Sequence, residues 1–225
     1  MPFKIESKQR EFFHRNGYIE FESLFPVKDT DKLSFHTDQT VIKRLPTPLM
    51  QTEVTSLYSA GRDLWRDSTA LRKYMLMRSL AEVAADLTLK PVIRTGCDQL
   101  FRTTTIPNPS FLSLSPLSSL TSIFPTIGGF LIRLLEGTSS SPWIPGAVGN
   151  GVFLSPSMEF NWQELFQTPN QSFLLLSYTI DKALYVHQSL DPNTHTLKNY
   201  DYGFGDHLTN LHHPVIFSHM TRQLS

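Results

Sequence analysis

The sequence changes its pattern at Pro91, and this change limits the folds open to the chain. Before Pro91, apolar residues recur at three- and four-residue spacing, most clearly over residues 68–87, as in a helix with one buried face. After it, short β-favouring runs are separated by loops rich in Ser, Pro and Gly. Helices followed by a series of strands predict an α+β domain whose strands form a sandwich or a barrel.

The expected elements follow this division. Helices are predicted over residues 8–15, from about 26 to 45 and over 68–87, with an early strand over 18–21. The strands expected after Pro91 cover residues 92–102, 120–127, 130–135, 152–154, 173–180, 183–187 and 215–217. No repeat or linker divides the sequence, so we predict one domain over 1–225, with helical support over 1–90 and a barrel over 91–225.

Charge and cysteine content narrow the class of protein. Twenty basic residues balance twenty acidic ones, so the chain lacks the positive field typical of nucleic-acid binding. Cys97 is the single cysteine, which excludes an internal disulfide and a cysteine-based zinc finger. The uncharged residues 103–132 contain four prolines and do not suit a membrane helix. The first residues have no apolar signal core, so we expect a cytoplasmic protein.

Five segments, in this order along the chain, resemble the phytanoyl-CoA dioxygenase family. They are EFFHRNGYI at 11–19, GRDLWRDS at 61–68 with the helix that follows, PVIRTGCDQLF at 91–101, IGGFL at 127–131, and VHQSLDPNT at 186–194. The resemblance implies a double-stranded β-helix, or jelly-roll, barrel with the N-terminal helices packed on its outside. It also implies iron(II) and 2-oxoglutarate as cofactors.

The family's site residues transfer to this sequence only in part. Members bind iron(II) through a His-x-Asp pair and a later histidine, and a basic residue binds the distal carboxylate of 2-oxoglutarate. His187 matches the later histidine, and Lys198 lies about where an arginine is usual. Strand alternation predicts that Ala183, Tyr185 and His187 share one face, with His187 lining the barrel cavity. Gln99, His187 and Lys198 are therefore the candidate pocket residues, and His187 is the candidate for an incomplete metal site.

The His-x-Asp pair itself is missing. It should lie between about Thr103 and Ser119, yet the sequence has no His, Asp or Glu from Gln99 to Leu135. Hydroxyl side chains are poor replacements as neutral iron ligands. We therefore expect a dioxygenase-like protein without standard oxygenase activity, which is either a binding protein for a small polar molecule or an enzyme of altered chemistry.

Two other patterns in the sequence offer alternative sites. His36-Thr37-Asp38 is a literal His-x-Asp, but in a helix the two side chains point about 200° apart. The C-terminal part is rich in histidine. One interpretation is a rebuilt metal site of Asp206 and His207 with His212 or His213; hydrogen-bonded loop histidines are the simpler one and the one we favour. The alternative function is a divalent-metal-responsive regulatory protein, with a DNA-binding repressor as its narrower form. Its candidate contact face is a basic stripe of Arg62, Arg66, Arg72, Lys73 and Arg78.

Overall fold

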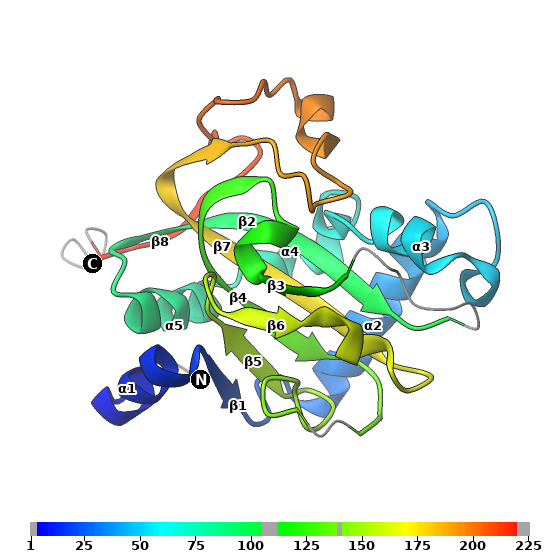
Figure 1. Cartoon of the computed structure of the whole chain (residues 1–225), viewed down its shortest axis with the longest axis horizontal. Coiled ribbons are helices and arrows are strands. Elements are labelled where there is room, and N and C mark those ends of the chain that lie inside the picture. Colours follow the sequence, from blue (N-terminus) through cyan, green and yellow to red (C-terminus); the bar gives the residue numbers. More distant parts are fainter. Residues whose placement is uncertain (1–3, 105–111, 139–140, 220–225) are drawn as a thin grey trace.

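The computed structural model describes residues 4–104, 112–138 and 141–219. A six-stranded antiparallel sheet has the strand order β1-β5-β4-β7-β2-β8, and β3 and β6 form a two-stranded antiparallel sheet (Figure 1). The strands are β1 Tyr18–Phe21, β2 Val92–Arg102, β3 Leu114–Pro116, β4 Ile123–Arg133, β5 Gly151–Leu154, β6 Glu159–Asn161, β7 Ser172–Tyr185 and β8 Val215–Ser218.

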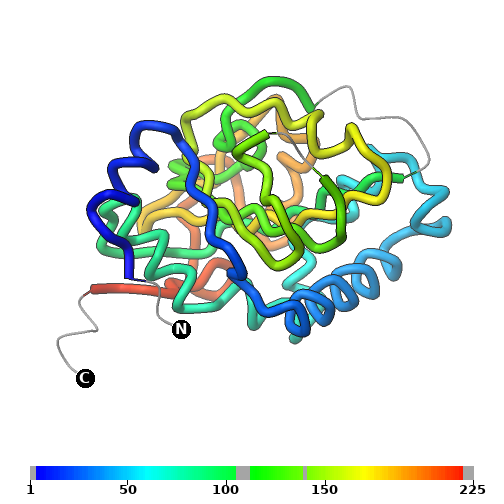
Figure 2. The backbone as a smooth tube through the Cα atoms, turned by 90° about the horizontal axis from the view of Figure 1, so that it is seen from below, coloured from blue at the N-terminus to red at the C-terminus, as the bar shows by residue number. Residues whose placement is uncertain are grey.

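The helices lie mainly before the second strand. They are α1 Ser7–Asn16, α2 Val27–Ile42, α3 Val54–Ala60, α4 Thr69–Met75 and α5 Arg78–Thr88. Short 3₁₀ helices are η1 Leu49–Gln51, η2 Leu64–Arg66, η3 Leu117–Leu120, η4 Trp162–Phe166 and η5 Thr196–Tyr200. Figure 2 shows α2 (blue) running along one side of the strands, with α1 at one end. This is the α+β arrangement that the sequence predicts.

The six-stranded sheet is apolar on both faces because each face has its own buried layer. On β7, Phe173 and Leu175 pack toward η4 and the two-stranded sheet, in a core where Phe101 stacks on Trp162 with ring centroids 5.6 Å apart. The alternate residues Leu174 and Leu176 pack in the core formed with the helices. Strands covered on both faces read as continuous apolar runs, which is the pattern of FLLL in this strand.

The single helix predicted over residues 68–87 is wrong, because the chain breaks into α4 and α5. Ser68 caps α4, accepting a hydrogen bond from the Leu71 amide at 3.3 Å. Leu76 and Met77 then leave helical geometry, and Met77 is extended with ψ 110°. The break changes the direction of the chain, and Met75 and Leu80 on its two sides are both buried.

The predicted strands differ from the observed ones in how they are joined. Residues 120–127 and 130–135, predicted apart, contribute to the one strand β4, and 173–180 with most of 183–187 form β7. Gly128 and Gly129 lie inside β4 rather than in a turn, and a side chain on Gly128 would meet the Leu154 carbonyl at 2.8 Å. The short strands β3 and β6 were not predicted.

Candidate functional site

Arg62 lies just after the end of α3, and its side chain is buried in the protein. A Cβ atom on Gly61, the C-cap of α3, would lie 2.9 Å from Leu100 Cβ, so this turn packs directly on β2. The Leu100 amide donates to the Gly61 carbonyl at 2.9 Å, and Arg62 forms an isolated antiparallel bridge with Gln99. The backbone is therefore fixed on both sides of Arg62 before its side chain makes any contact.

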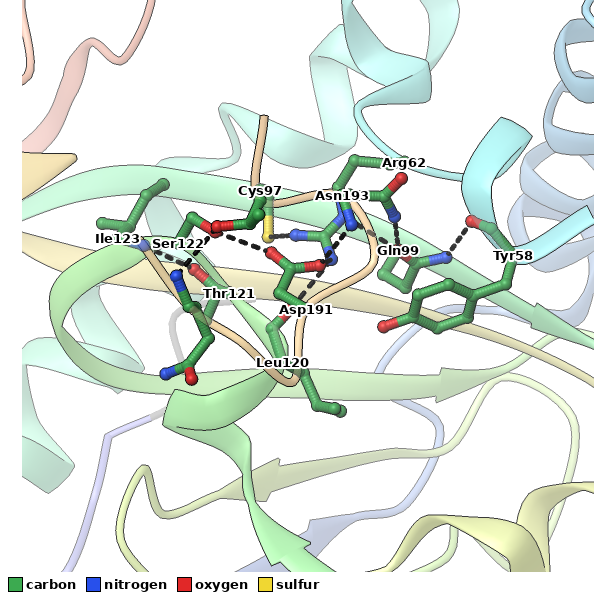
Figure 3. A network of polar contacts seen from close by, with 12 residues as sticks. Tyr58, Arg62, Cys97, Gln99, Leu120, Thr121, Ser122, Ile123, Asp191 and Asn193 are labelled. Atoms are coloured by element: carbon green, nitrogen blue, oxygen red, sulfur yellow. Dashed lines mark hydrogen bonds and ion pairs between the residues drawn. The ribbon is translucent and has the colours of Figure 1, made fainter. Parts of the chain in front are cut away.

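The guanidinium of Arg62 has four partners, from three separate parts of the chain (Figure 3). It donates to Gln99 Oε1 at 2.8 Å and Cys97 Sγ at 3.0 Å on β2, and to the Leu120 carbonyl at 2.8 Å. Its Nη2 atom also donates to Asp191 Oδ1 at 2.9 Å. Burial alone would lower the pKa of Arg62, but the negative charge of Asp191 opposes this effect. The net result is a pKa above the ordinary arginine value, so the guanidinium stays protonated.

Asp191 is held by hydrogen bonds as well as by the ion pair. The Asn193 amide donates to Oδ1 at 3.0 Å, and Ser122 Oγ donates to Oδ2 at 3.0 Å. Thr194 Oγ1 lies 2.9 Å from Ser122 Oγ and accepts a hydrogen bond from the Gln188 amide at 2.8 Å. Both oxygens of the buried carboxylate are thus satisfied, as the low dielectric there requires.

The candidate pocket residue Gln99 lies in this cluster, and its amide group is fully used. Its Oε1 atom accepts from Arg62, and its Nε2 atom donates to the carbonyls of Tyr58 at 2.8 Å and Leu100 at 2.9 Å. The cavity beside Arg62 and Asp191 measures about 10 Å³, roughly the room that one water molecule needs. We call Arg62, Cys97, Gln99, Ser122, Asp191 and Thr194 the Arg62 cluster.

His187 does not lie in the Arg62 cluster, so the prediction that it lines the cavity is wrong. Alternation holds as far as Tyr185, which is fully buried like Ala183. The strand ends there, and the His187 side chain is exposed, with its ring 5.4 Å from that of Phe204. Lys198 is also exposed, and its Nζ atom lies 4.9 Å from the centre of the same Phe204 ring. The two candidates therefore both contact Phe204, outside the protein core.

The residues at the expected iron site do not fit iron(II). Among the residues that the structure describes, no group of three or more His, Cys, Asp and Glu side chains is placed to hold a metal. Residues 105–111, part of the segment expected to carry the His-x-Asp pair, lie outside the described ranges, but their sequence contains no His, Asp or Glu. Asp191 is the carboxylate in the cluster, and it is paired with a guanidinium whose positive charge would repel a divalent cation.

The two other sequence patterns also have structural roles. Asp38 pairs with Arg102 at 2.9 Å, while His36 lies in a groove beside Tyr74, so they face different neighbours. His213 is fully buried: Arg66 Nη2 donates to its Nε2 at 3.0 Å, and its Nδ1 lies 3.3 Å from Tyr202 OH. Burial and the charge of Arg66 lower the pKa of His213 to about 2.

The basic stripe proposed as a DNA contact face is not one continuous surface, because only Arg72, Lys73 and Arg78 of its five residues are exposed. Arg62 is buried, and Arg66, which is mostly buried, donates to the His212 carbonyl at 2.9 Å.

Among the described helices, none is long and apolar enough to cross a membrane.

A buried carboxyl pair that the sequence did not reveal lies beneath η2. Asp98 accepts hydrogen bonds from the amides of Leu64 at 2.7 Å and Trp65 at 2.8 Å. Burial, together with the charge of nearby Asp63, raises the pKa of Asp98 to about 7. This carboxyl fixes η2, and with it the turn that carries Arg62.

No family model and no curated protein sequence matches the chain, so the narrower resemblance to phytanoyl-CoA dioxygenases remains a prediction. Solved structures do match. SnoN, a non-haem α-ketoglutarate-dependent epimerase of nogalamycin biosynthesis, aligns with a TM-score of 0.64 and 12% identity over 93% of this chain and 97% of that one. HygX from Streptomyces hygroscopicus, solved with nickel and 2-oxoglutarate, aligns with a TM-score of 0.56 and 10% identity over 94% of this chain and 98% of that one.

A third match is CT296 from Chlamydia trachomatis, with a TM-score of 0.52 and 16% identity over 80% of this chain and 98% of that one. Identities this low establish a common fold and nothing about activity. The predicted jelly-roll is thereby confirmed: the chain has the double-stranded β-helix fold of the non-haem α-ketoglutarate-dependent enzymes.

Proposed function

We propose that this chain is a non-oxygenase binding protein built on the dioxygenase-like fold. The observation that carries the proposal is the buried Arg62–Asp191 ion pair, at 2.9 Å, among the segments to which the resemblance assigns the iron site. Asp191 follows the strand that leads to His187, and Ser122 follows the segment expected to carry the His-x-Asp pair. A positively charged side chain holds together segments that a metal ion holds together in an oxygenase.

The chemistry of the cluster supports a structural role rather than a catalytic one. A bound metal needs lone pairs that are free to coordinate, and those of Gln99 Oε1 and Asp191 already accept hydrogen bonds. The Cys97 thiol is buried against Arg62 and Ser177, and burial raises its pKa, which keeps it protonated. The remaining cavity has room for a water molecule but not for 2-oxoglutarate. Any larger ligand must therefore bind on another surface.

The experiment is a turnover assay on the purified full chain with iron(II), ascorbate and 2-oxoglutarate, with succinate followed by proton NMR. We expect no succinate above a protein-free control, and no stoichiometric iron(II) binding in equilibrium dialysis. Iron-dependent succinate formation that is lost in His187→Ala, but kept in the matched exposed variant His207→Ala, would overturn the proposal.

A further inference from the structure

A pocket of about 300 Å³ lies on the face of the six-stranded sheet that the helices cover, between the ends of α1 and α5. Its floor is formed by Phe13 from α1, Ile127 from β4 and Ile180 from β7, which belong to or pack on the core shared with the helices. The Arg62 cluster does not contribute to it. The volume is at the lower end of the range for small-molecule sites, which are also mainly apolar.

The ladder between β4 and β7 is irregular beside this pocket. Thr126 pairs with Thr179, but the next pair along β4 is Phe124 with Leu184. Pro125 thus stands alone opposite the β7 residues 180–183, and it has no amide hydrogen to donate to the ladder. Such irregularities redirect side chains and are enriched beside functional sites. Pro125 and Ile180, which lie at this irregularity, both line the pocket.

The charges around the pocket indicate what it would bind. Two of the ten lining residues, His14 and Lys90, can carry a positive charge, and none is acidic. Both side chains are exposed, and neither forms an ion pair with any residue in the described ranges. An apolar floor beside an unpaired lysine ammonium is complementary to an anionic group attached to an apolar chain.

We propose that this pocket binds a small carboxylate with an apolar chain, of the class of short fatty acids. The chain lies against Ile127 and Ile180, and the carboxylate faces Lys90 and His14. This inference goes beyond the proposed function and does not depend on it, because the pocket and the Arg62 cluster share no residue.

The test uses octanoate as the probe and the full chain as the protein, with binding measured by calorimetry. Octylamine and 1-octanol have the same chain length with a positive and an uncharged head group. We expect octanoate to bind more tightly than either. We expect Lys90→Gln to weaken octanoate binding about threefold to fivefold, the effect of one exposed ion pair, and to leave 1-octanol binding unchanged. The control Lys182→Gln removes an exposed lysine of β7 that does not line the pocket, and we expect it to have no effect.

A second measurement separates the pocket from general hydrophobic binding. Ile180→Trp fills the hollow and should abolish octanoate binding in a protein with an unchanged circular dichroism spectrum. In the wild-type chain, amide NMR shifts caused by octanoate should centre on Lys90, Ile127 and Ile180 and leave Arg62 and Asp191 unaffected, a readout that needs no variant to fold. Octylamine binding as tightly as octanoate, equal effects of Lys90→Gln and Lys182→Gln, or shifts centred elsewhere would each refute the assignment.

Discussion

Arg62 Nη2 and Asp191 Oδ1 lie 2.9 Å apart, although the two residues are 129 positions apart in the sequence. Their side chains are 5% and 1% exposed, so water screens the attraction very little. The pair joins the turn after α3 to the loop after β7, and these are otherwise distant parts of the chain. The same burial means that either partner alone would be an isolated charge in the core.

Removing one partner should therefore destabilise the fold strongly. We expect Arg62→Met to lower the free energy of unfolding by about 3–5 kcal/mol, because it leaves the Asp191 carboxylate buried and unpaired. The double variant Arg62→Met with Asp191→Leu should recover part of that loss, since no charge then remains. Urea denaturation, monitored by circular dichroism, gives the free energy of unfolding of the wild type, of Arg62→Met and of the double variant.

An exposed pair on the same molecule provides the control. Arg78 and Glu82 lie 3.2 Å apart on α5, with Arg78 51% exposed. Arg78→Met should change the free energy of unfolding by less than about 1 kcal/mol. Equal effects of Arg62→Met and Arg78→Met would contradict the assigned role of the buried pair.

The sequence predicted the parts of the fold that depend on local pattern. The bounds of β2 agree with the prediction, because Pro91 marks its start. The strands β3 and β6 have three residues each, and their existence depends on pairing with each other, which no local pattern reveals. The break between α4 and α5 lacks Pro or Gly, so the sequence offered no signal for it.

The site was less predictable than the fold, for a physical reason. The absence of a His-x-Asp pair could be read directly, but the Arg62–Asp191 contact that accompanies it depends on tertiary structure. The sequence placed Arg62 in a basic stripe, because residue spacing cannot show that the turn after α3 directs this side chain into the protein. The alternation that placed His187 inside was correct to Tyr185 and failed where β7 ends.

His187 and His213 offer a matched comparison of an exposed and a buried histidine. His187→Ala should change the free energy of unfolding by no more than about 0.5 kcal/mol, as is usual for surface positions. His213→Ala should cost more than about 2 kcal/mol at pH 7.5, because it leaves a cavity and removes an acceptor from Arg66. Thermal and urea unfolding of both variants decide the point, and a larger effect of His187→Ala would refute the observed burial.

Asp98 should titrate close to neutral pH. Its pKa is raised to about 7 by burial and by Asp63, so the stability it contributes is complete below about pH 4 and is lost as the pH rises through 7. The carbon-13 shift of the Asp98 carboxyl should show a midpoint near pH 7 that is absent from Asp98→Asn. The destabilisation caused by Asp98→Asn should increase by about 1.4 kcal/mol for each pH unit between 7 and about 4. A midpoint near pH 4 would show that the carboxyl is not desolvated.

His213 should give the opposite pH dependence. Its pKa is lowered to about 2 in the folded protein from 6.5, so the unfolded chain takes up a proton that the folded one rejects below pH 6.5. The contribution of His213 to the free energy of unfolding of the wild type is therefore fully present above pH 6.5. It decreases by about 1.4 kcal/mol for each pH unit as the pH falls below that value. His213→Gln cannot be protonated, so its destabilisation relative to the wild type should shrink by that amount between pH 6.5 and 4.5. Urea midpoints measured at half-unit steps test this, and a constant difference across the range would mean that His213 is protonated inside the fold, with Arg66 displaced from its ring nitrogen.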